Sequence, residues 1–278
     1  MKLNPYLEVI LAILIMGSSG MFVKLLHLTP ITLSFFRMAL PSFLLFIYFS
    51  IQGVNLFRFP FKLMLIGSVI NAARIFLFIT SYTYTNISNG VIILYTWPVF
   101  ATVFSMIFLG EKVPLRNKFL LLFPITGIIL MFINQPFSTQ NDDFIGMCAM
   151  LLSAILYAIT IIVFKKESHK YSGFETVFFQ NLAGGFIFLP FFIQRDLSFS
   201  WEQLLMVLFF AIVIGIGAFG LFFSALKKIK ASTVSFMTYL EVLIATMYGV
   251  MVFDEKLSWN IIIGGSLIVI STLLLKKR

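Results

Sequence analysis

The sequence YTWPVFATVFSMIFLGEKVP, at residues 95–114, resembles a second stretch of the same chain, YLEVLIATMYGVMVFDEKLS at residues 239–258. Each stretch is an apolar run about long enough to span a bilayer as a helix, and each ends in Glu-Lys. At a constant offset of 144 residues, the identical pairs are Tyr95 and Tyr239, Ala101 and Ala245, Thr102 and Thr246, Glu111 and Glu255, and Lys112 and Lys256. These matches indicate a repeat if the offset also holds elsewhere in the chain.

The composition of the chain is that of an integral membrane protein. Hydrophobic residues make up 60% of the 278 residues and charged residues only 11%, which lies outside the range of soluble globular domains. The single cysteine, Cys148, excludes an internal disulfide framework and a multi-cysteine metal site, and the two histidines do not suggest a buried metal centre. We therefore expect an all-α integral membrane protein without a metal or other cofactor.

Ten apolar segments are long enough to cross a hydrocarbon layer about 30 Å thick, which takes roughly 20 helical residues. They are residues 7–26, 30–51, 62–81, 89–109, 116–133, 144–164, 174–193, 203–224, 231–252 and 258–275. The apolar runs are continuous rather than alternating, which excludes porin-like strands. The sequence therefore predicts ten transmembrane helices.

The basic residues give the orientation of these segments. With the N-terminus inside, 15 of the 20 Lys and Arg residues fall in inner segments, three fall in outer loops, and Arg37 and Arg74 lie inside spans. Inner loops are enriched in Lys and Arg, so both termini are predicted to be cytoplasmic. The net charge of +9 is then a topology signal, and nucleic-acid binding is not needed to explain it. The short loops suit a bacterial inner membrane.

The repeat offset also holds outside the first pair of stretches. FFR at residues 35–37 aligns with FFQ at residues 178–180 at an offset of 143, and Ser88 aligns with Ser232 at 144. The matches divide the chain into two halves of five spans, residues 1–138 and 139–278. Because five is odd, the halves would insert in opposite orientations. Inverted repeats allow an inward-open cavity to become an outward-open one, which favours a transporter over an enzyme or a scaffold.

Several short motifs carry a family resemblance. They are GSSGMFVK at residues 17–24, Pro30 with Phe36-Arg37, WPVFA at 97–101, LGEK at 109–112, YLE at 239–241 and DEK at 254–256. In their order and spacing, the chain resembles ten-span members of the drug/metabolite transporter superfamily, of the EamA type. The resemblance covers the whole chain and implies a basket of helices around a central cavity, with metabolite movement by alternating access.

Two positions depart from the pattern of that family. Met16 stands where the family often has Trp, which leaves the packing of the first helix uncertain. Val242 stands where the second half usually has Pro after Glu. Because proline removes a backbone hydrogen bond and promotes a kink, the second departure predicts a ninth helix that is straighter than the fourth.

Two ionisable residues are predicted near the middle of the membrane. At 1.5 Å per residue, Arg74 lies about 18 Å and Glu241 about 15 Å from the inner surface. An intramembrane charge costs roughly 2.5–3.5 kcal/mol on insertion scales, so such residues are usually paired or face a water-filled cavity. Arg74 and Glu241 could bind the two ends of a zwitterion such as an amino acid, or could form a structural ion pair with each other.

Aromatic and amide side chains are further candidates for a substrate site. Trp97 is too deep for interfacial anchoring, and we interpret it as lining a cavity. Tyr95 and Tyr239 precede Trp97 and Glu241 by two residues. The remaining candidates are Tyr82, Tyr157, Asn71, Gln180 and Asn181.

Four other residues are expected to have structural or hinge roles. Arg37 lies seven residues from the outer end of its span, from where it could snorkel to the headgroups or cap a helix end. Glu111 and Glu255 lie where spans end, so hinge or end-pairing roles suit them better than substrate contact. Pro98 is expected to kink the fourth helix.

The leading hypothesis is a secondary transporter whose partners are a small-molecule substrate and the lipid bilayer. An organic cation, held by Glu241 and aromatic faces, is the alternative to a zwitterion. An intramembrane enzyme would need a nucleophile–base pair or metal ligands within spans, and the sequence offers no such histidine, cysteine pair or HExxH motif. A lipid-handling or scaffold protein would not need the inverted repeat. No Walker-type loop is present, so ATP is not used directly. Proton coupling through Glu241, passive facilitation, import or export, and a monomer or homodimer all stay open.

Overall fold

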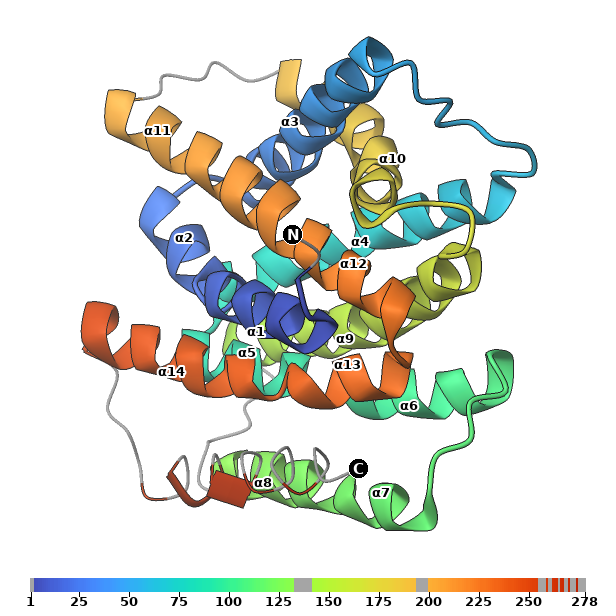
Figure 1. Ribbon diagram of the computed structural model, residues 1–278. Helices are drawn as coiled ribbons and strands as arrows, with labels where there is room; N and C mark the ends of the chain where they lie inside the picture. The colour runs from blue at the N-terminus through green and yellow to red at the C-terminus, as the bar shows by residue number, and fades with distance from the viewer. Residues whose placement is uncertain are drawn as a thin grey trace.

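The computed structural model describes residues 3–132, 142–193 and 200–254, together with residues 259, 262–264, 266, 267, 270 and 274. Within these residues the regular elements are all helices (Figure 1). Those of the first half are α1 (Pro5–Met16), α2 (Ser19–Leu26), α3 (Pro30–Ile51), α4 (Lys62–Tyr84), α5 (Ile87–Leu94), α6 (Trp97–Phe108), α7 (Leu115–Leu120) and α8 (Leu122–Phe132). Those of the second half are α9 (Asp142–Glu167), α10 (Gly173–Ile193), α11 (Trp201–Phe209), the π-helix η1 (Phe210–Ala218), α12 (Phe219–Lys228), α13 (Ala231–Met237) and α14 (Leu240–Phe253).

Eight helical segments among the described residues are long and apolar enough to cross a membrane. They are Pro5–Leu26, Pro30–Ile51, Lys62–Tyr84, Gly90–Phe108, Phe144–Glu167, Gly173–Ile193, Trp201–Lys228 and Ala231–Phe253. These correspond to the first four predicted spans and to the sixth to ninth. The predicted fifth span is divided into α7 and α8 by a turn at Leu121, and the predicted tenth span lies largely outside the described residues.

Three of the spans are interrupted near their middle. The first span is divided between α1 and α2 at Gly17-Ser18, the fourth between α5 and α6 at Tyr95-Thr96, and the ninth between α13 and α14 at Thr238-Tyr239. Proline at position 98 accounts for part of the break in the fourth span, because it cannot donate a backbone hydrogen bond. The ninth span is also interrupted, although it has no proline at this position. That it is straighter than the fourth stays a prediction.

Threonine hydroxyls donate to backbone carbonyls at the breaks in the fourth and ninth spans. The Thr238 hydroxyl donates to the Ser235 carbonyl at 2.7 Å, and the Thr96 hydroxyl donates to the Ile93 carbonyl at 2.8 Å at the break in the fourth span. Such side-chain bonds compete with the backbone ladder and bend helices. The interruption of the ninth span therefore does not require a proline.

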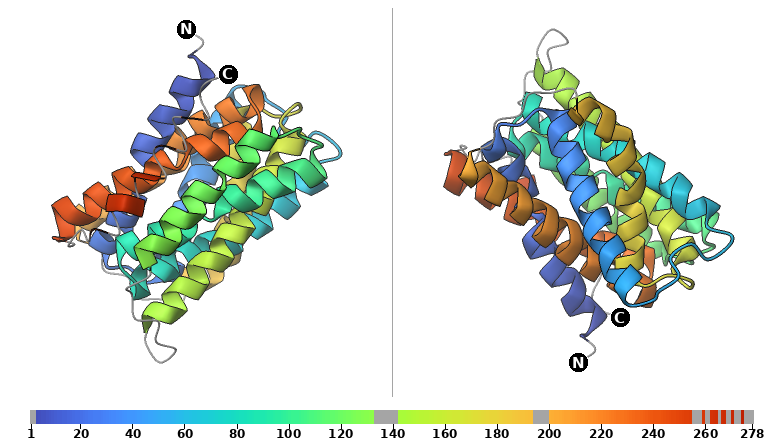
Figure 2. Two further views of the ribbon diagram at one scale, coloured as in Figure 1. Left: turned by 90° about the horizontal axis from the view of Figure 1, so that it is seen from below. Right: turned by 90° about the horizontal axis from the view of Figure 1, so that it is seen from above.

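The long helices pack through small residues and buried hydrogen bonds. Helix α4 lies against α9 and α10, and α3 lies against α10, as the right-hand view of Figure 2 shows for α3 in blue and α10 in gold. The Ser68 hydroxyl on α4 accepts a hydrogen bond from the Ala183 amide at 2.7 Å, and the Ser153 hydroxyl on α9 donates to the Arg74 carbonyl at 3.0 Å. Interhelical polar contacts of this kind are typical of helix packing in membranes, and here they fix the helix that carries Arg74.

Candidate functional site

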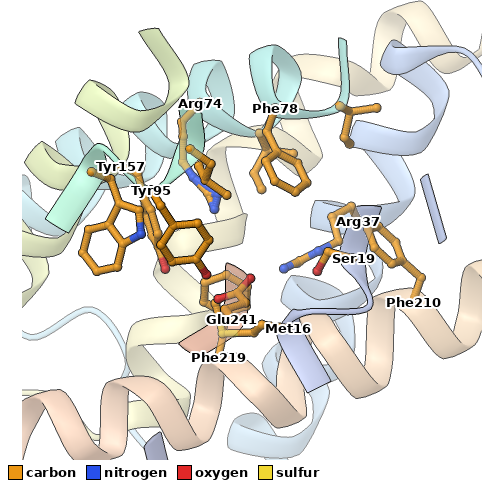
Figure 3. A pocket seen from close by; sticks show the side chains of 14 residues that line it. Met16, Ser19, Arg37, Arg74, Phe78, Tyr95, Tyr157, Phe210, Phe219 and Glu241 are labelled. Carbon is orange, nitrogen blue, oxygen red and sulfur yellow. The ribbon is translucent and has the colours of Figure 1, made fainter. Parts of the chain in front are cut away.

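A small cavity of about 30 Å³ lies inside the helix bundle (Figure 3). Its lining comes from both halves of the chain and consists of Met16, Ser19, Arg37, Arg74, Ile75, Phe78, Ile79, Leu94, Tyr95, Trp97, Tyr157, Phe210, Phe219 and Glu241. A volume of this size holds one or a few water molecules but not a metabolite. The cavity of this structure is therefore too small to hold a metabolite.

Arg74 projects from α4 into this cavity and is surrounded by aromatic rings. Its side chain is buried, and its guanidinium carbon lies 4.1 Å from the centre of the Tyr157 ring and 5.7 Å from that of Phe78. A guanidinium over an aromatic face is attracted by the quadrupole of the ring. The Nε atom of Arg74 is buried and has no hydrogen-bond partner. The aromatic rings thus hold the charge in place while leaving hydrogen-bonding capacity unused.

Arg37 projects from α3 toward the same cavity, in contrast to the expectation that it snorkels to the headgroups. Its side chain is only 3% exposed, and its guanidinium carbon lies 5.1 Å from the centre of the Phe219 ring and 5.6 Å from that of Phe210. Its Nη1 atom donates a long hydrogen bond, 3.5 Å, to the Asn181 amide oxygen. Figure 3 shows Arg37 and Arg74 reaching into the cavity from different helices.

Glu241 carries the negative charge of the cavity. It is the second residue of α14, directly after the break in the ninth span, and its side chain is buried. A carboxylate in the first turn of a helix is stabilised by the helix dipole. The Tyr95 hydroxyl lies toward the carboxylate in Figure 3 but makes no hydrogen bond of standard geometry to it.

The three charged side chains of the cavity do not neutralise one another by direct contact. The ion pairs found in the described part of the chain join Arg58 to Glu175, Lys170 to Glu167, and Lys228 to Glu8. None of them includes Arg37, Arg74 or Glu241, so the structural Arg74–Glu241 ion pair considered from the sequence is not formed. Both signs of charge face the cavity.

The aromatic candidates form two pairs next to these charges. Trp97 packs on Tyr157 with ring centres 4.6 Å apart, and Tyr95 packs on Tyr239 at 6.0 Å. The hydroxyl groups of the three tyrosines are buried without a hydrogen-bond partner. Tyr239 is not among the residues that line the cavity.

Besides Tyr239, four of the predicted substrate-site residues lie outside the lining. The Asn71 amide donates to the Gln180 carbonyl at 2.8 Å and so joins α4 to α10. The Asn181 amide donates to the Val177 carbonyl at 2.8 Å, which turns its oxygen toward Arg37. The Gln180 side chain is buried without a hydrogen-bond partner, and Tyr82 packs edge-on against Phe78 at 4.9 Å.

Several lining residues were not singled out from the sequence. Met16 and Ser19 flank the break in the first span, whereas Phe210 and Phe219 flank the π-helix η1. π-Helical segments occur frequently at functional sites, but no sequence signal distinguishes these two rings among the 35 phenylalanines. The Gly-Ser-Ser-Gly motif was the one available signal for the first break.

Glu111 lies far from the cavity and holds a helix end. Its carboxylate accepts hydrogen bonds from the backbone amides of Ala231, at 3.0 Å, and Ser232, at 3.3 Å, and from the Ser232 hydroxyl, at 3.0 Å. These groups form the N-terminus of α13, where free N–H groups favour a negative charge. These contacts join the residue that follows the fourth span to the start of α13, and the hinge or end-pairing role expected of Glu111 stays a prediction. Its predicted counterpart, Glu255, lies outside the described residues.

The fold and the cavity together define a helical membrane protein with an enclosed, charged interior site. The family model of the EamA-like transporter family matches the chain twice, over residues 4–133 and 144–276. The chain belongs to the EamA-like transporter family.

Similar proteins are also transporters by name. An uncharacterized transporter of Archaeoglobus fulgidus is 24% identical over 96% of this chain and 94% of its own length. The pseudopaline exporter CntI of Pseudomonas aeruginosa is 24% identical over 87% of this chain and 84% of its own. A crystal structure that carries no functional description has 16% sequence identity and a TM-score of 0.78, and the match covers 98% of this chain and 96% of that one. This last likeness concerns the fold alone.

Proposed function

We propose that this protein is a secondary transporter that moves a small organic metabolite, an amino acid or a related zwitterion, across the cytoplasmic membrane by alternating access. The observation that carries the proposal is the pair of unneutralised, opposite charges at the cavity. Arg74 and Glu241 both line it, come from different halves of the chain, and form no ion pair with each other. The carboxylate of a substrate bound to Arg74 and its ammonium group bound near Glu241 would neutralise both side chains.

Alternating access is supported by the similarity of the two halves. The family model matches each half, and the fourth and ninth spans are interrupted beside Tyr95 and Tyr239, which are 144 residues apart. Interrupted helices at the interface of inverted repeats form the substrate sites of many secondary transporters. A contracted cavity of about 30 Å³ is compatible with an occluded state that must widen to admit a substrate. The name of one relative, a pseudopaline exporter, supports transport in the outward direction.

The organic-cation alternative is less well supported by the charges. The cavity lining contains two arginines and one glutamate, so its formal charge is +1 when all three are ionised. A ligand whose only charge is positive would meet this excess without the compensation of its own carboxylate. We therefore favour the zwitterion.

A counterflow assay in proteoliposomes tests the proposal. Vesicles loaded with one unlabelled amino acid at a time from a panel would be assayed for uptake of the same labelled amino acid, with and without a pH gradient. We expect uptake by the wild type and its loss in Arg74→Gln and in Glu241→Gln. Lys62→Gln is the matched control, because Lys62 is an exposed cation at the start of the helix that carries Arg74. Uptake that survives both cavity substitutions would contradict the proposal, and a dependence on the pH gradient would identify proton coupling.

A further inference from the structure

The second arginine of the cavity has no role in binding a simple zwitterion. Arg37 is buried, lines the cavity and contacts no carboxylate in the described part of the chain. We propose that its partner is a second carboxylate of the substrate, so that the transported metabolite is an acidic amino acid or a related compound with two carboxylates and one ammonium group. This inference rests on the proposed function and names the substrate class of the same site.

The two guanidinium groups are close enough to act on one small ligand. Their carbons lie 5.1 Å (Arg37) and 6.0 Å (Arg74) from the centre of a single ring, that of Phe219. Both side chains point into the cavity in Figure 3, with Glu241 between and below them. A short dicarboxylate could therefore reach both arginines while its ammonium group stays near Glu241.

The residues around Arg37 hold its guanidinium in place but accept few of its hydrogen bonds. Its polar partner is neutral, the Asn181 oxygen, and the bond is long at 3.5 Å. Asn181 is itself fixed by its bond to the Val177 carbonyl. Gly215 of η1 lies so near that a Cβ atom there would be 3.0 Å from Nη1 of Arg37. Because a guanidinium has five N–H donors and matches a carboxylate in a bidentate geometry, most of its donor capacity is free for a ligand.

The charge balance of the closed cavity selects among substrate classes. With Arg37, Arg74 and Glu241 ionised, the lining carries a net charge of +1. A ligand with net charge −1 makes the occluded site neutral, whereas a neutral zwitterion leaves one buried cation uncompensated and an organic cation adds another. Uncompensated charge is costly in the low-dielectric interior of a membrane protein. The occluded state is therefore most favourable with a monoanionic ligand.

A basic hollow at another place in the bundle supports the same class of substrate. It has a volume of about 570 Å³, and Lys165, Lys228, Lys230 and Glu111 supply its charged lining. Lys230 and Thr233, also in the lining, lie at the start of α13, whereas Glu241 follows the end of that helix. Lys228 is paired with Glu8, and Lys165 donates to the Ile229 carbonyl at 2.8 Å. Lys165 and Lys230 then exceed Glu111 by one formal positive charge, which favours an anion over a cation in this hollow.

Counterflow with matched pairs of substrates tests this inference. Aspartate would be compared with asparagine, and glutamate with glutamine, because each pair differs chiefly in one negative charge. We expect wild-type protein to prefer the acidic member by about tenfold or more, the size of effect typical of one charge-assisted hydrogen bond. Arg37→Gln should lose this preference and still transport the amides, while Arg74→Gln should transport neither. Lys62→Gln should behave as the wild type.

A second measurement does not depend on the folding of a variant. Aspartate should raise the unfolding temperature of the purified wild-type protein at lower concentration than asparagine does, because a ligand stabilises the state that binds it. Equal transport and equal stabilisation by both members of each pair would overturn the inference and leave the proposed function standing. If folded Arg37→Gln protein still prefers the acidic amino acid over its amide, Arg37 does not bind the second carboxylate. Failure to transport or bind any amino acid would overturn both proposals.

Discussion

The fourth and the ninth spans are interrupted at related positions but present different chemistry at the break. After the break in the fourth span, α6 begins with Trp97-Pro98, and Trp97 packs on Tyr157 beside Arg74. After the break in the ninth span, α14 begins with Leu240-Glu241 and places a carboxylate in its first turn. The two halves thus use a similar backbone device, with tyrosines at 95 and 239 packed on each other, to present an aromatic wall on one side and a negative charge on the other.

The largest effect is expected at the residue that makes the two breaks different. Glu241→Gln keeps the shape of the side chain and removes its charge. Truncating one partner of a buried charged contact typically costs about 2–5 kcal/mol, so amino-acid uptake should fall by about 100-fold. Glu202→Gln, an exposed carboxylate in the first turn of α11, is the matched control and should leave uptake unchanged. Wild-type uptake in the Glu241 variant would mean that the asymmetry of the breaks does not serve binding.

The break in the first span should be the next most sensitive. A Cβ atom on Gly17 would lie 2.6 Å from Cγ2 of Ile244 on α14, so Gly17→Ala must push α1 and the Glu241 helix apart. Overpacking of this kind costs about 1–3 kcal/mol, and we expect a lower unfolding temperature together with reduced uptake. At Gly217 the nearest atom to an added Cβ is 3.9 Å away, and Gly217→Ala should therefore be tolerated. Equal unfolding temperatures for the two variants would argue against close packing at the first break.

Glu111, which accepts hydrogen bonds at the N-terminus of α13, should contribute to stability rather than to substrate choice. Glu111→Gln removes the negative charge that accepts hydrogen bonds from Ala231 and Ser232. Loss of an N-terminal cap costs about 0.5–2 kcal/mol, so thermal unfolding of the purified protein should begin at a lower temperature. The ratio of aspartate to asparagine uptake should not change. A changed ratio would show that the end of α13 influences the cavity directly.

The smallest effect is expected at Pro98. The ninth span is interrupted without a proline. At the break in the fourth span the Thr96 hydroxyl donates to a backbone carbonyl, as the Thr238 hydroxyl does at the break in the ninth span. We therefore expect Pro98→Ala to retain uptake within about threefold of wild type, since a shift below about 0.7 kcal/mol corresponds to that range. Uptake that is abolished in a folded Pro98→Ala protein would show that the two breaks depend on different causes.

The sequence predicts the eight described spans and the two opposite charges, Arg74 and Glu241, that line the cavity. Arg74 and Glu241 could be identified because ionisable residues deep in a membrane span are rare and costly. Arg37 was misplaced, because the distance of a residue from the end of a helix does not determine whether its face meets lipid or protein. The helices packed around α3, and the approach of Gly215, settle that question only in three dimensions.

Other features of the site carry no signal in the sequence. Phe219 contacts both arginines, yet it is one of many phenylalanines in a chain where most aromatic residues pack between helices or face outward. The break beside Tyr239 has no proline to mark it in the sequence, although the Thr238 hydroxyl donates a competing hydrogen bond to the Ser235 carbonyl there.

The central claim is that unneutralised charges in the cavity bind the substrate, and equilibrium binding tests it most directly. Labelled amino acids would be titrated onto purified wild-type protein and onto the Arg74→Gln, Glu241→Gln and Lys62→Gln variants. Binding measures the site without requiring movement between the two sides of the membrane. The account predicts saturable binding to the wild type and to Lys62→Gln, and its loss in both cavity variants. Undiminished binding to folded Arg74→Gln and Glu241→Gln proteins would contradict it.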